Sequence, residues 1–119
     1  MVVIKDVVPT FFVQDTCRSA AWYQRVLGGN VAFESGGYCG VDLGSARIHL
    51  AQVEAPPPRG TSYKGAFYLR LESGVDELVA RIEAAGQALT ATLKNHDYGM
   101  REATVRDPDG NDIYVGQPT

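Results

Sequence analysis

The spacing of apolar residues predicts two helices in this chain. In the second of them, apolar residues follow the i, i+3, i+4, i+7 pattern of a half-buried helix, at Val75, Leu78, Val79 and Ile82. The first follows Asp15, a residue type that is favoured as a helix N-cap. Glycines stand where each helix should end, Gly29 after the first and Gly86 after the second.

The remaining apolar segments have the alternation and β-branched content of strands. They lie at residues 2–14, 31–35, 38–43, 47–53, 65–72, 88–93, 101–107 and 111–116. Pro9 interrupts the first segment, so that strand must be bent or lie at a sheet edge. A strong turn is predicted between Asp107 and Asn111, because proline presets φ there and Gly110 tolerates a positive φ.

These elements repeat in the order β-α-β-β-β. Module one covers residues 1–53, a proline-rich linker covers 54–64, and module two covers 65–119. Each module is too small to fold alone, so both must share one core within a single domain. We therefore predict an α+β fold in which two β-α-β-β-β modules form a curved mixed sheet around a cleft.

Strand alternation sorts side chains onto two faces of the sheet. One face is apolar and should lie under the helices, with Ile48, Leu50, Phe67, Leu69, Leu71, Ala103, Val105, Ile113 and Val115. The other carries aromatic, histidine and charged residues: Thr10, Phe12, Tyr38, Asp42, Arg47, His49, Tyr68, Arg70, Glu102, Thr104, Asp112 and Tyr114. This second face is either a solvated surface or the lining of a ligand cavity, and its clustered tyrosines favour the cavity.

We predict that eight residues bind the ligand: Phe12, Tyr38, His49, Tyr68, Arg70, Tyr98, Glu102 and Tyr114. Aromatic rings would stack on a planar ligand while hydroxyls and His49 orient it. Glu102 has two interpretations. It could form an acid–base pair with His49, or it could pair with Arg70 or Arg47 across the sheet, and we favour the ion pair.

Composition narrows the function classes. The net charge is −3, from 14 acidic and 11 basic residues, and no basic stripe is present, so a nucleic-acid partner is not expected. No apolar run approaches the ~20 residues of a membrane span, and we expect a cytoplasmic protein that does not contact a membrane. Cys17 and Cys39 both fall at positions that resemble core, so we expect two buried free thiols.

Segments at both ends of the chain resemble one family. The segments are Val8 to Asp15, Ala21 to Tyr23, Val26 to Gly28, Tyr98 to Glu102 and Val105 to Asn111. Together they are similar to the vicinal oxygen chelate superfamily, and most of all to bleomycin resistance proteins and their glyoxalase-like relatives. The resemblance covers nearly the whole chain, and it implies the same paired-module fold that the repeat predicts.

The resemblance also bears on metal binding. Enzymes of the superfamily place metal ligands in the first and last strands of each module, and the matching positions here are Val8, His49, Ala66 and Tyr114. Only His49 is a strong metal ligand, whereas a catalytic metal needs about three protein ligands. His96 is a second candidate, but we expect it to be a solvated loop residue. We therefore predict no metal and no cofactor.

The function implied by the resemblance is non-catalytic binding. The protein would bind a small planar or aromatic molecule, an antibiotic among the candidates, and sequester it. Pro9 matches the hinge proline of bleomycin resistance proteins, which implies a homodimer with an exchanged N-terminal arm, residues 1–8. The alternative is a glyoxalase- or dioxygenase-like enzyme of the same superfamily, and a third reading is a sensor or structural dimer.

Overall fold

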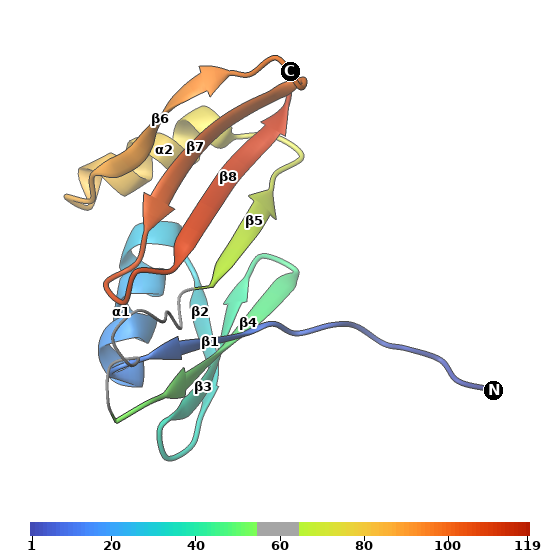
Figure 1. Cartoon of the computed structure of the whole chain (residues 1–119), viewed down its shortest axis with the longest axis vertical. Coiled ribbons are helices and arrows are strands. Elements are labelled where there is room, and N and C mark those ends of the chain that lie inside the picture. The colour runs from blue at the N-terminus through green and yellow to red at the C-terminus, as the bar shows by residue number, and fades with distance from the viewer. Residues whose placement is uncertain (55–64) are drawn as a thin grey trace, which may run out of the picture.

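A computed structural model describes residues 1–54 and 65–119 of the chain (Figure 1). All but the first residue of the expected linker, 54–64, therefore lie outside the described residues. The elements are β1 (Thr10–Val13), α1 (Thr16–Leu27), β2 (Asn30–Glu34), β3 (Tyr38–Leu43), β4 (Ala46–Gln52), β5 (Ala66–Arg70), α2 (Val75–Ala84), β6 (Leu89–Asn95), β7 (Met100–Arg106) and β8 (Asp112–Pro118). The α+β fold of two β-α-β-β-β modules is confirmed.

The strands form two four-stranded mixed sheets. The first has the strand order β1-β4-β3-β2 and the second has the order β5-β8-β7-β6. In each, the first strand of the module pairs in parallel with the last strand, and the other pairs are antiparallel. The two sheets are not joined into a closed sheet, so β1 and β5 each pair with one neighbour within their sheet.

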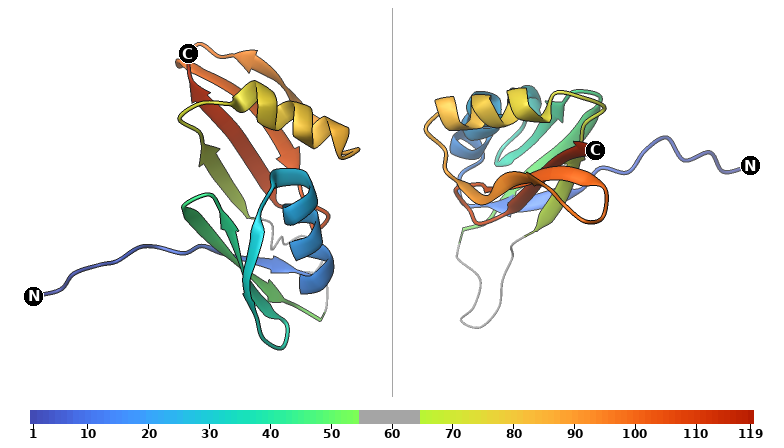
Figure 2. Two further views of the ribbon diagram at one scale, coloured as in Figure 1. Left: turned by 180° about the vertical axis from the view of Figure 1, so that it is seen from behind. Right: turned by 90° about the horizontal axis from the view of Figure 1, so that it is seen from above.

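Both helices cover the same side of the molecule, which leaves the opposite sheet faces uncovered by helix (Figure 2). Asp15 caps α1 as expected, because its carboxylate oxygen accepts from the Arg18 N–H at 3.1 Å. Gly28 ends α1 in the left-handed region, with φ of 73°. Gly86, at φ of 80°, follows the end of α2 in the same conformation.

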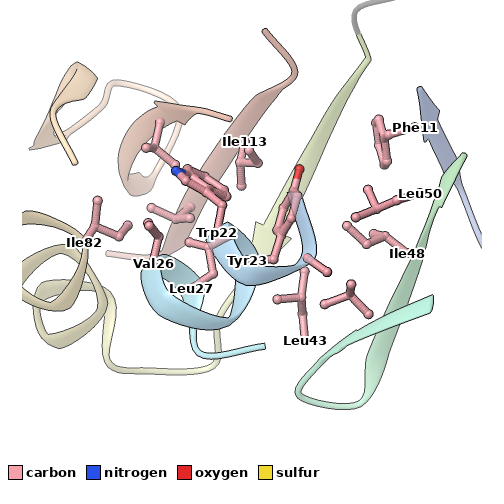
Figure 3. Close-up of a cluster of buried hydrophobic side chains, with 14 of the residues drawn as sticks. Phe11, Trp22, Tyr23, Val26, Leu27, Leu43, Ile48, Leu50, Ile82 and Ile113 are labelled. Atoms are coloured by element: carbon pink, nitrogen blue, oxygen red, sulfur yellow. The ribbon is translucent and has the colours of Figure 1, made fainter. Parts of the chain in front are cut away.

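The core lies between the helices and the apolar sheet faces (Figure 3). Six of the residues predicted from strand parity are buried: Ile48, Leu50, Ala103, Val105, Ile113 and Val115. Phe67, Leu69 and Leu71 pack against them and are partly buried. Tyr23 of α1 is fully buried at the centre, with its ring in an edge contact with Trp22 and a stacked contact with Phe67.

The turn from Asp107 to Asn111 joins the two modules. The Tyr23 hydroxyl of module one donates to the Asp107 carboxylate at 2.8 Å, and this carboxylate is almost fully buried. Burial raises the pKa of the Tyr23 phenol far above its ordinary value, as does the neighbouring Asp107. Asp109 accepts from the Ser19 hydroxyl at 2.8 Å. The predicted turn is present, and its carboxylates also fix the interface between the modules.

Two sequence expectations were wrong. Regular pairing in the first strand covers only Thr10–Val13, because the residues before Pro9 have no neighbouring strand, and they extend away from the body as an arm (Figure 1). Cys39 is buried as expected, whereas Cys17 is exposed, because it lies at the open edge between α1 and β2 with its sulfur 3.7 Å from a Glu34 oxygen. In the described part of the chain, no helix has the length and apolarity that crossing a membrane requires.

Candidate functional site

Three tyrosines and a glutamate gather on the helix-free face of the second sheet. Tyr68 of β5 and Tyr114 of β8 are neighbours in the parallel ladder, with ring centroids 6.1 Å apart and planes inclined by only 15°. The Tyr98 hydroxyl, from the turn before β7, donates to Glu102 at 2.6 Å. The Tyr68 hydroxyl lies near enough to Glu102 for this carboxylate to raise the pKa of Tyr68. We call these four residues the tyrosine–glutamate cluster.

Gly116 makes this arrangement possible. Gly116 stands beside Glu102 in the β7–β8 ladder and beside Arg70 in the β5–β8 ladder. The Tyr68 phenol crosses above Gly116 on its way from β5 to Glu102 of β7. A Cβ at Gly116 would come well under 3.0 Å from the Tyr68 hydroxyl oxygen. A glycine inside a strand thus marks the close approach of a neighbouring side chain.

His96 completes the surroundings of Glu102. Its ring stacks on Tyr98 with centroids 4.9 Å apart, and its Nε2 lies 3.9 Å from a Glu102 oxygen. The turn from β6 to β7 holds it there through the His96 N–H, which donates to the Met100 carbonyl at 2.8 Å. We expected a solvated loop residue, but the His96 side chain is only 21% exposed. Sequence spacing gave no signal of this contact.

The ionisable groups of the cluster are strongly perturbed. Burial raises the pKa of Glu102, but hydrogen bonds from Tyr98 and Tyr68 outweigh it, and the net pKa is lowered. The hydrogen bond to Glu102, followed by desolvation, raises the pKa of Tyr98 to about 12. Desolvation is the largest cause that raises the pKa of Tyr68 to about 12, and the Glu102 carboxylate is the second. Glu102 is therefore an ionised carboxylate beside the neutral phenols of Tyr68 and Tyr98 at physiological pH.

A second aromatic group lies on the helix-free face of the first sheet. The Tyr38 hydroxyl and His49 Nδ1 are 2.9 Å apart, and the two rings meet edge to face at 5.3 Å. Thr10 Oγ1 is 3.3 Å from the same hydroxyl. Phe33 of β2 also packs edge-on against His49, at 5.2 Å. We call Phe33, Tyr38 and His49 the histidine group.

Phe33 was not predicted as a site residue. Its ring lies over Gly40, where a Cβ would again come under 3.0 Å from ring carbons. The available signal was Gly40 itself, a glycine in the middle of a strand. The Arg47 guanidinium is 5.9 Å from the centre of the Phe33 ring and pairs with Asp42 at 2.7 Å. This pairing holds the pKa of Asp42 below its ordinary value.

The predicted site residues thus fall into two places. Tyr38 and His49 meet on the first sheet, whereas Tyr68, Tyr98, Glu102 and Tyr114 meet on the second. Within the described ranges, no hydrogen bond, ion pair or ring contact links the histidine group to the tyrosine–glutamate cluster.

The other two predicted residues lie outside both groups. Phe12 of β1 is 45% exposed and stands opposite Ala51, and Arg70 is exposed at the end of β5.

The expected pairing of Glu102 with an arginine was wrong. Tyrosine hydroxyls and His96 surround its carboxylate, while Arg47 is held by Asp42 on the other sheet. The acid–base pair with His49 is also not formed, because the two residues belong to different sheets. Arg70 affects this region only through its charge, which lowers the pKa of Tyr68 slightly against the larger opposing causes.

The ladders correct the alignment of the candidate metal positions. His49 stands beside Thr10 and Tyr114 stands beside Tyr68, so the matching first-strand positions are Thr10 and Tyr68 in place of Val8 and Ala66. A threonine hydroxyl and neutral phenols are weak metal ligands. Within residues 1–54 and 65–119, no three His, Cys, Asp or Glu side chains come together in a way that could hold a metal ion.

An open groove of about 780 Å³ runs between the modules beside β5. The β3–β4 turn and the end of α1 form one wall, and β5 with the start of α2 forms the other, so that Leu27, Leu43, Leu71 and Leu78 all contribute. A smaller hollow of about 240 Å³ lies between the base of the arm and Phe67, Tyr68 and Leu69. Both hollows border β5, and Tyr68 lines both.

Comparison with known proteins identifies relatives of this architecture. The family model described as the glyoxalase/bleomycin resistance protein/dioxygenase superfamily matches residues 5–115. No curated protein sequence matched the chain.

Solved structures share the fold. A bleomycin resistance determinant encoded on the transposon Tn5 superposes with a TM-score of 0.81 at 20% identity, covering 97% of this chain and 98% of that one. A bleomycin-binding protein in complex with bleomycin gives 0.79 at 21% identity, covering 98% and 100%. A lactoylglutathione lyase from Agrobacterium tumefaciens gives 0.76 at 21% identity, covering 96% and 94%. Identities this low establish a common fold and leave the activity open.

Proposed function

Because the chain belongs to the glyoxalase/bleomycin resistance protein/dioxygenase superfamily, we propose that it binds a small planar or aromatic molecule and sequesters it unchanged. The mechanism is stoichiometric. Each bound molecule is removed from the free pool, so protection scales with the amount of protein. Antibiotics of the bleomycin class are the first candidates, since two structural neighbours are a bleomycin-binding protein and a bleomycin resistance determinant.

The observation that carries this proposal is the tyrosine–glutamate cluster. Tyr68, Tyr98 and Tyr114 are all at least 36% exposed although they are large apolar rings. Exposed aromatic rings held in place by hydrogen bonds are suited to stacking on a flat ligand, because little side-chain entropy is lost on binding. The histidine group offers a second such surface on the other sheet.

The protonation states favour binding over acid–base catalysis. A general acid or base works best with a pKa near the operating pH. In the cluster the pKa of Glu102 is lowered and the pKa values of Tyr68 and Tyr98 are raised to about 12, so each pKa lies further from pH 7 than usual. Such groups hold their charge and hydrogen-bond pattern across the physiological range.

We further propose that the protein is a homodimer in which residues 1–8 of each chain reach onto the partner. The arm leaves the body and exposes five apolar side chains, those of Met1, Val2, Val3, Ile4 and Val7. β5 pairs only with β8 in its sheet, and the two hollows border it. A partner arm laid along this region would cover apolar surface and an unpaired strand edge.

Such a dimer would also affect the site. The histidine group and the cluster belong to different sheets of one chain, and a partner chain packed beside β5 would close the space next to Tyr68.

We propose that the protein works in the cytoplasm, where the free and exposed Cys17 thiol suits a reducing environment.

Thermal denaturation with candidate ligands tests the binding role. We expect bleomycin or another planar compound from a small aromatic panel to raise the unfolding midpoint in a concentration-dependent way. Calorimetry should then give a fixed stoichiometry, and mass spectrometry should recover the compound unchanged after prolonged incubation. Recovery of a chemically altered compound would contradict sequestration and point to catalysis.

An enzyme of the same superfamily is the alternative, and His49 is the residue that supports it. Its ring is oriented by Tyr38, as metal-binding histidines are commonly oriented by a second group. Elemental analysis of the purified protein distinguishes the two. About one zinc, nickel, manganese or iron per chain, lost in His49→Ala, would establish a metal site and contradict the non-catalytic role.

A further inference from the structure

We propose that the tyrosine–glutamate cluster is a subsite for a positively charged nitrogen, so that the ligand is a planar or aromatic cation. This inference rests on the proposed binding function and adds to it the charge of the ligand. It follows from the position of Glu102, from the direction of the hydrogen bonds around it, and from the three tyrosine rings that surround it.

Glu102 carries a charge that no strong cation compensates. The residue is only 8% exposed, and burial of a carboxylate is costly unless it is paired or hydrogen-bonded. The Tyr98 phenol donates to it at 2.6 Å, the Tyr68 phenol lies nearby, and His96 Nε2 lies at 3.9 Å. Among the residues that the structure describes, no lysine or arginine forms an ion pair with it. A ligand cation would supply the missing opposite charge.

The nearby arginines are engaged elsewhere. Arg101 adjoins Glu102 in sequence but binds Asp76 at 2.7 Å and Asn95 at 3.2 Å. Arg106 at the far end of β7 binds Asp112 at 2.7 Å. Two exposed cations border the cluster: Arg70 at the end of β5, whose charge reaches Tyr68, and Lys94, which stands opposite Glu102 in the β6–β7 ladder but forms no ion pair with it. Arg70 opposes cation binding, but it is solvated, whereas Glu102 is buried.

Hydrogen-bond direction disfavours an anionic ligand. The Tyr98 hydroxyl uses its proton on Glu102, so toward a ligand its oxygen can act only as an acceptor. An anion approaching the cluster would meet acceptor oxygens and a carboxylate. A quaternary ammonium has no N–H group, so it does not need a hydrogen-bond acceptor in a particular position. It is attracted to the negative faces of aromatic rings.

The rings provide those faces. Tyr68 and Tyr114 lie nearly parallel at 6.1 Å, and both are more than one-third exposed. Tyr98 is 61% exposed and its hydroxyl is held by Glu102. Exposed ring faces beside a buried carboxylate are the chemistry that recognises methylated or substituted ammonium groups.

Three small aromatic probes of similar size test the charge preference. The probes are 3-hydroxyphenyltrimethylammonium, its neutral isostere 3-tert-butylphenol, and the anion 3-hydroxybenzoate. Binding is followed by NMR shifts of the tyrosine rings at millimolar probe concentrations. We expect the ammonium probe to bind about tenfold tighter than the neutral isostere, with the largest shifts at Tyr68, Tyr98 and Tyr114, and the benzoate to bind least.

Matched variants locate the effect. Glu102→Gln keeps an oxygen acceptor for the Tyr98 hydroxyl and removes the charge, so it should abolish the preference of the ammonium probe over 3-tert-butylphenol. Glu83→Gln removes the same charge from the exposed surface of α2 and should leave the preference intact. Arg70→Gln should strengthen ammonium binding severalfold.

The outcomes are distinguishable. Equal binding of all three probes, or a preference that survives in Glu102→Gln, would overturn the cation subsite while leaving the binding role in place. If the benzoate bound most tightly, the cation subsite would also be overturned, and the preference for an anion would be assigned to Arg70. Failure of every probe to bind would overturn the inference as well, and an empty ligand panel alongside it would also remove the proposed function.

Discussion

Tyr68 and Gly116 are in contact across neighbouring strands, and the phenol hydroxyl occupies the place that a side chain at Gly116 would need. The absence of a Cβ lets the ring pass over β8 and reach Glu102. The same packing arrangement occurs on the other sheet, where the Phe33 ring lies over Gly40 and makes an edge contact with His49. In both sheets a strand glycine allows an aromatic side chain from a neighbouring strand to approach the backbone closely on the open face.

This contact predicts the effect of Gly116→Ala. The new Cβ would displace the Tyr68 hydroxyl and also approach the Arg101 carbonyl oxygen, which stands 3.1 Å from the ideal Cβ position. We expect the free energy of unfolding to fall by about 1–3 kcal/mol, the usual range for overpacking. The pKa of Tyr68 should move back toward its ordinary value. Chemical denaturation measures the first effect, and absorbance titration measures the second.

A double-mutant cycle checks the cause. If the Tyr68 hydroxyl is the main obstacle, Gly116→Ala should cost clearly less in a Tyr68→Ala background than in the parent, because the two residues are in contact. Additive effects would show that the Arg101 carbonyl or the strand backbone causes the destabilisation.

Sequence patterns predicted much of the fold for simple physical reasons. Strand parity identifies buried residues because alternate side chains point to opposite faces, and it placed Ile48, Leu50 and Ile113 in the core. Asp15 and the helix-ending glycines have local signatures. The first strand was predicted too long, because apolar residues before Pro9 resemble a strand whether or not a neighbour is present to pair with them.

The site was harder to predict because its contacts cross strands. Parity assigns Glu102 to the open face but cannot say whether an arginine or a tyrosine reaches it. That outcome depends on the register of three strands and on the missing side chain at Gly116. His96 was treated as a solvated residue because its stacking on Tyr98 arises from the shape of one turn.

Alkaline titration should reveal the two phenols bound to Glu102. Their pKa values are raised from 10.0 to about 12, so the neutral phenol is favoured in the folded state. The associated stability is fully present below pH 10 and is lost as the pH rises from about 10 to about 12. Because the pKa of Tyr23 is also raised, phenolate absorbance near pH 11 should be lower than five ordinary tyrosines would give, and Tyr68→Phe and Tyr98→Phe should each change it by less than one ordinary tyrosine.

Glu102→Gln is the informative variant in this titration. The hydrogen bond to Glu102 is the largest cause of the raised pKa of Tyr98, so in this variant the pKa of Tyr98 should move furthest back toward 10. The pKa of Tyr68 is raised mainly by desolvation, so it should move less. Circular dichroism must show that the protein remains folded at each pH. Unchanged phenol titration in this variant would contradict the hydrogen bonds assigned here.

Tyr23→Phe should destabilise the junction of the modules. The substitution keeps the ring but removes the donor to Asp107, whose carboxylate is 4% exposed. Loss of one partner of a buried charged hydrogen bond costs about 1–3 kcal/mol, and the other donors to Asp107, from Asn111 and Asp109, should preserve the fold. Tyr114→Phe is the control, because the Tyr114 hydroxyl lies on the exposed face and makes no hydrogen bond to any described residue, so it should change the unfolding midpoint far less.

Removal of residues 1–8 tests the proposed arm. We expect the full-length protein to have the mass of a dimer at micromolar concentration by light scattering, and the truncated chain to shift toward monomer. The arm exposes apolar side chains such as Ile4 and Val7, so the truncated protein should still be folded, since these side chains contribute nothing to its own core. A monomeric parent would contradict the dimer, and a dimeric truncated chain would contradict the exchange of the arm.

Substitution of the stacked tyrosines tests whether the cluster binds the ligand. Tyr114 is 36% exposed and its ring contacts Tyr68 on the open face, so Tyr114→Ala removes a stacking surface without opening a cavity in the core. A stacking contact contributes about 0.5–1.5 kcal/mol beyond burial, so any compound identified by thermal denaturation should bind severalfold more weakly to Tyr114→Ala and to Tyr68→Ala. Tyr38→Ala, on the first sheet, separates the two aromatic groups. If it alone weakens binding while both second-sheet variants bind like the parent, the ligand lies on the histidine group, and the tyrosine–glutamate cluster is a solvated surface.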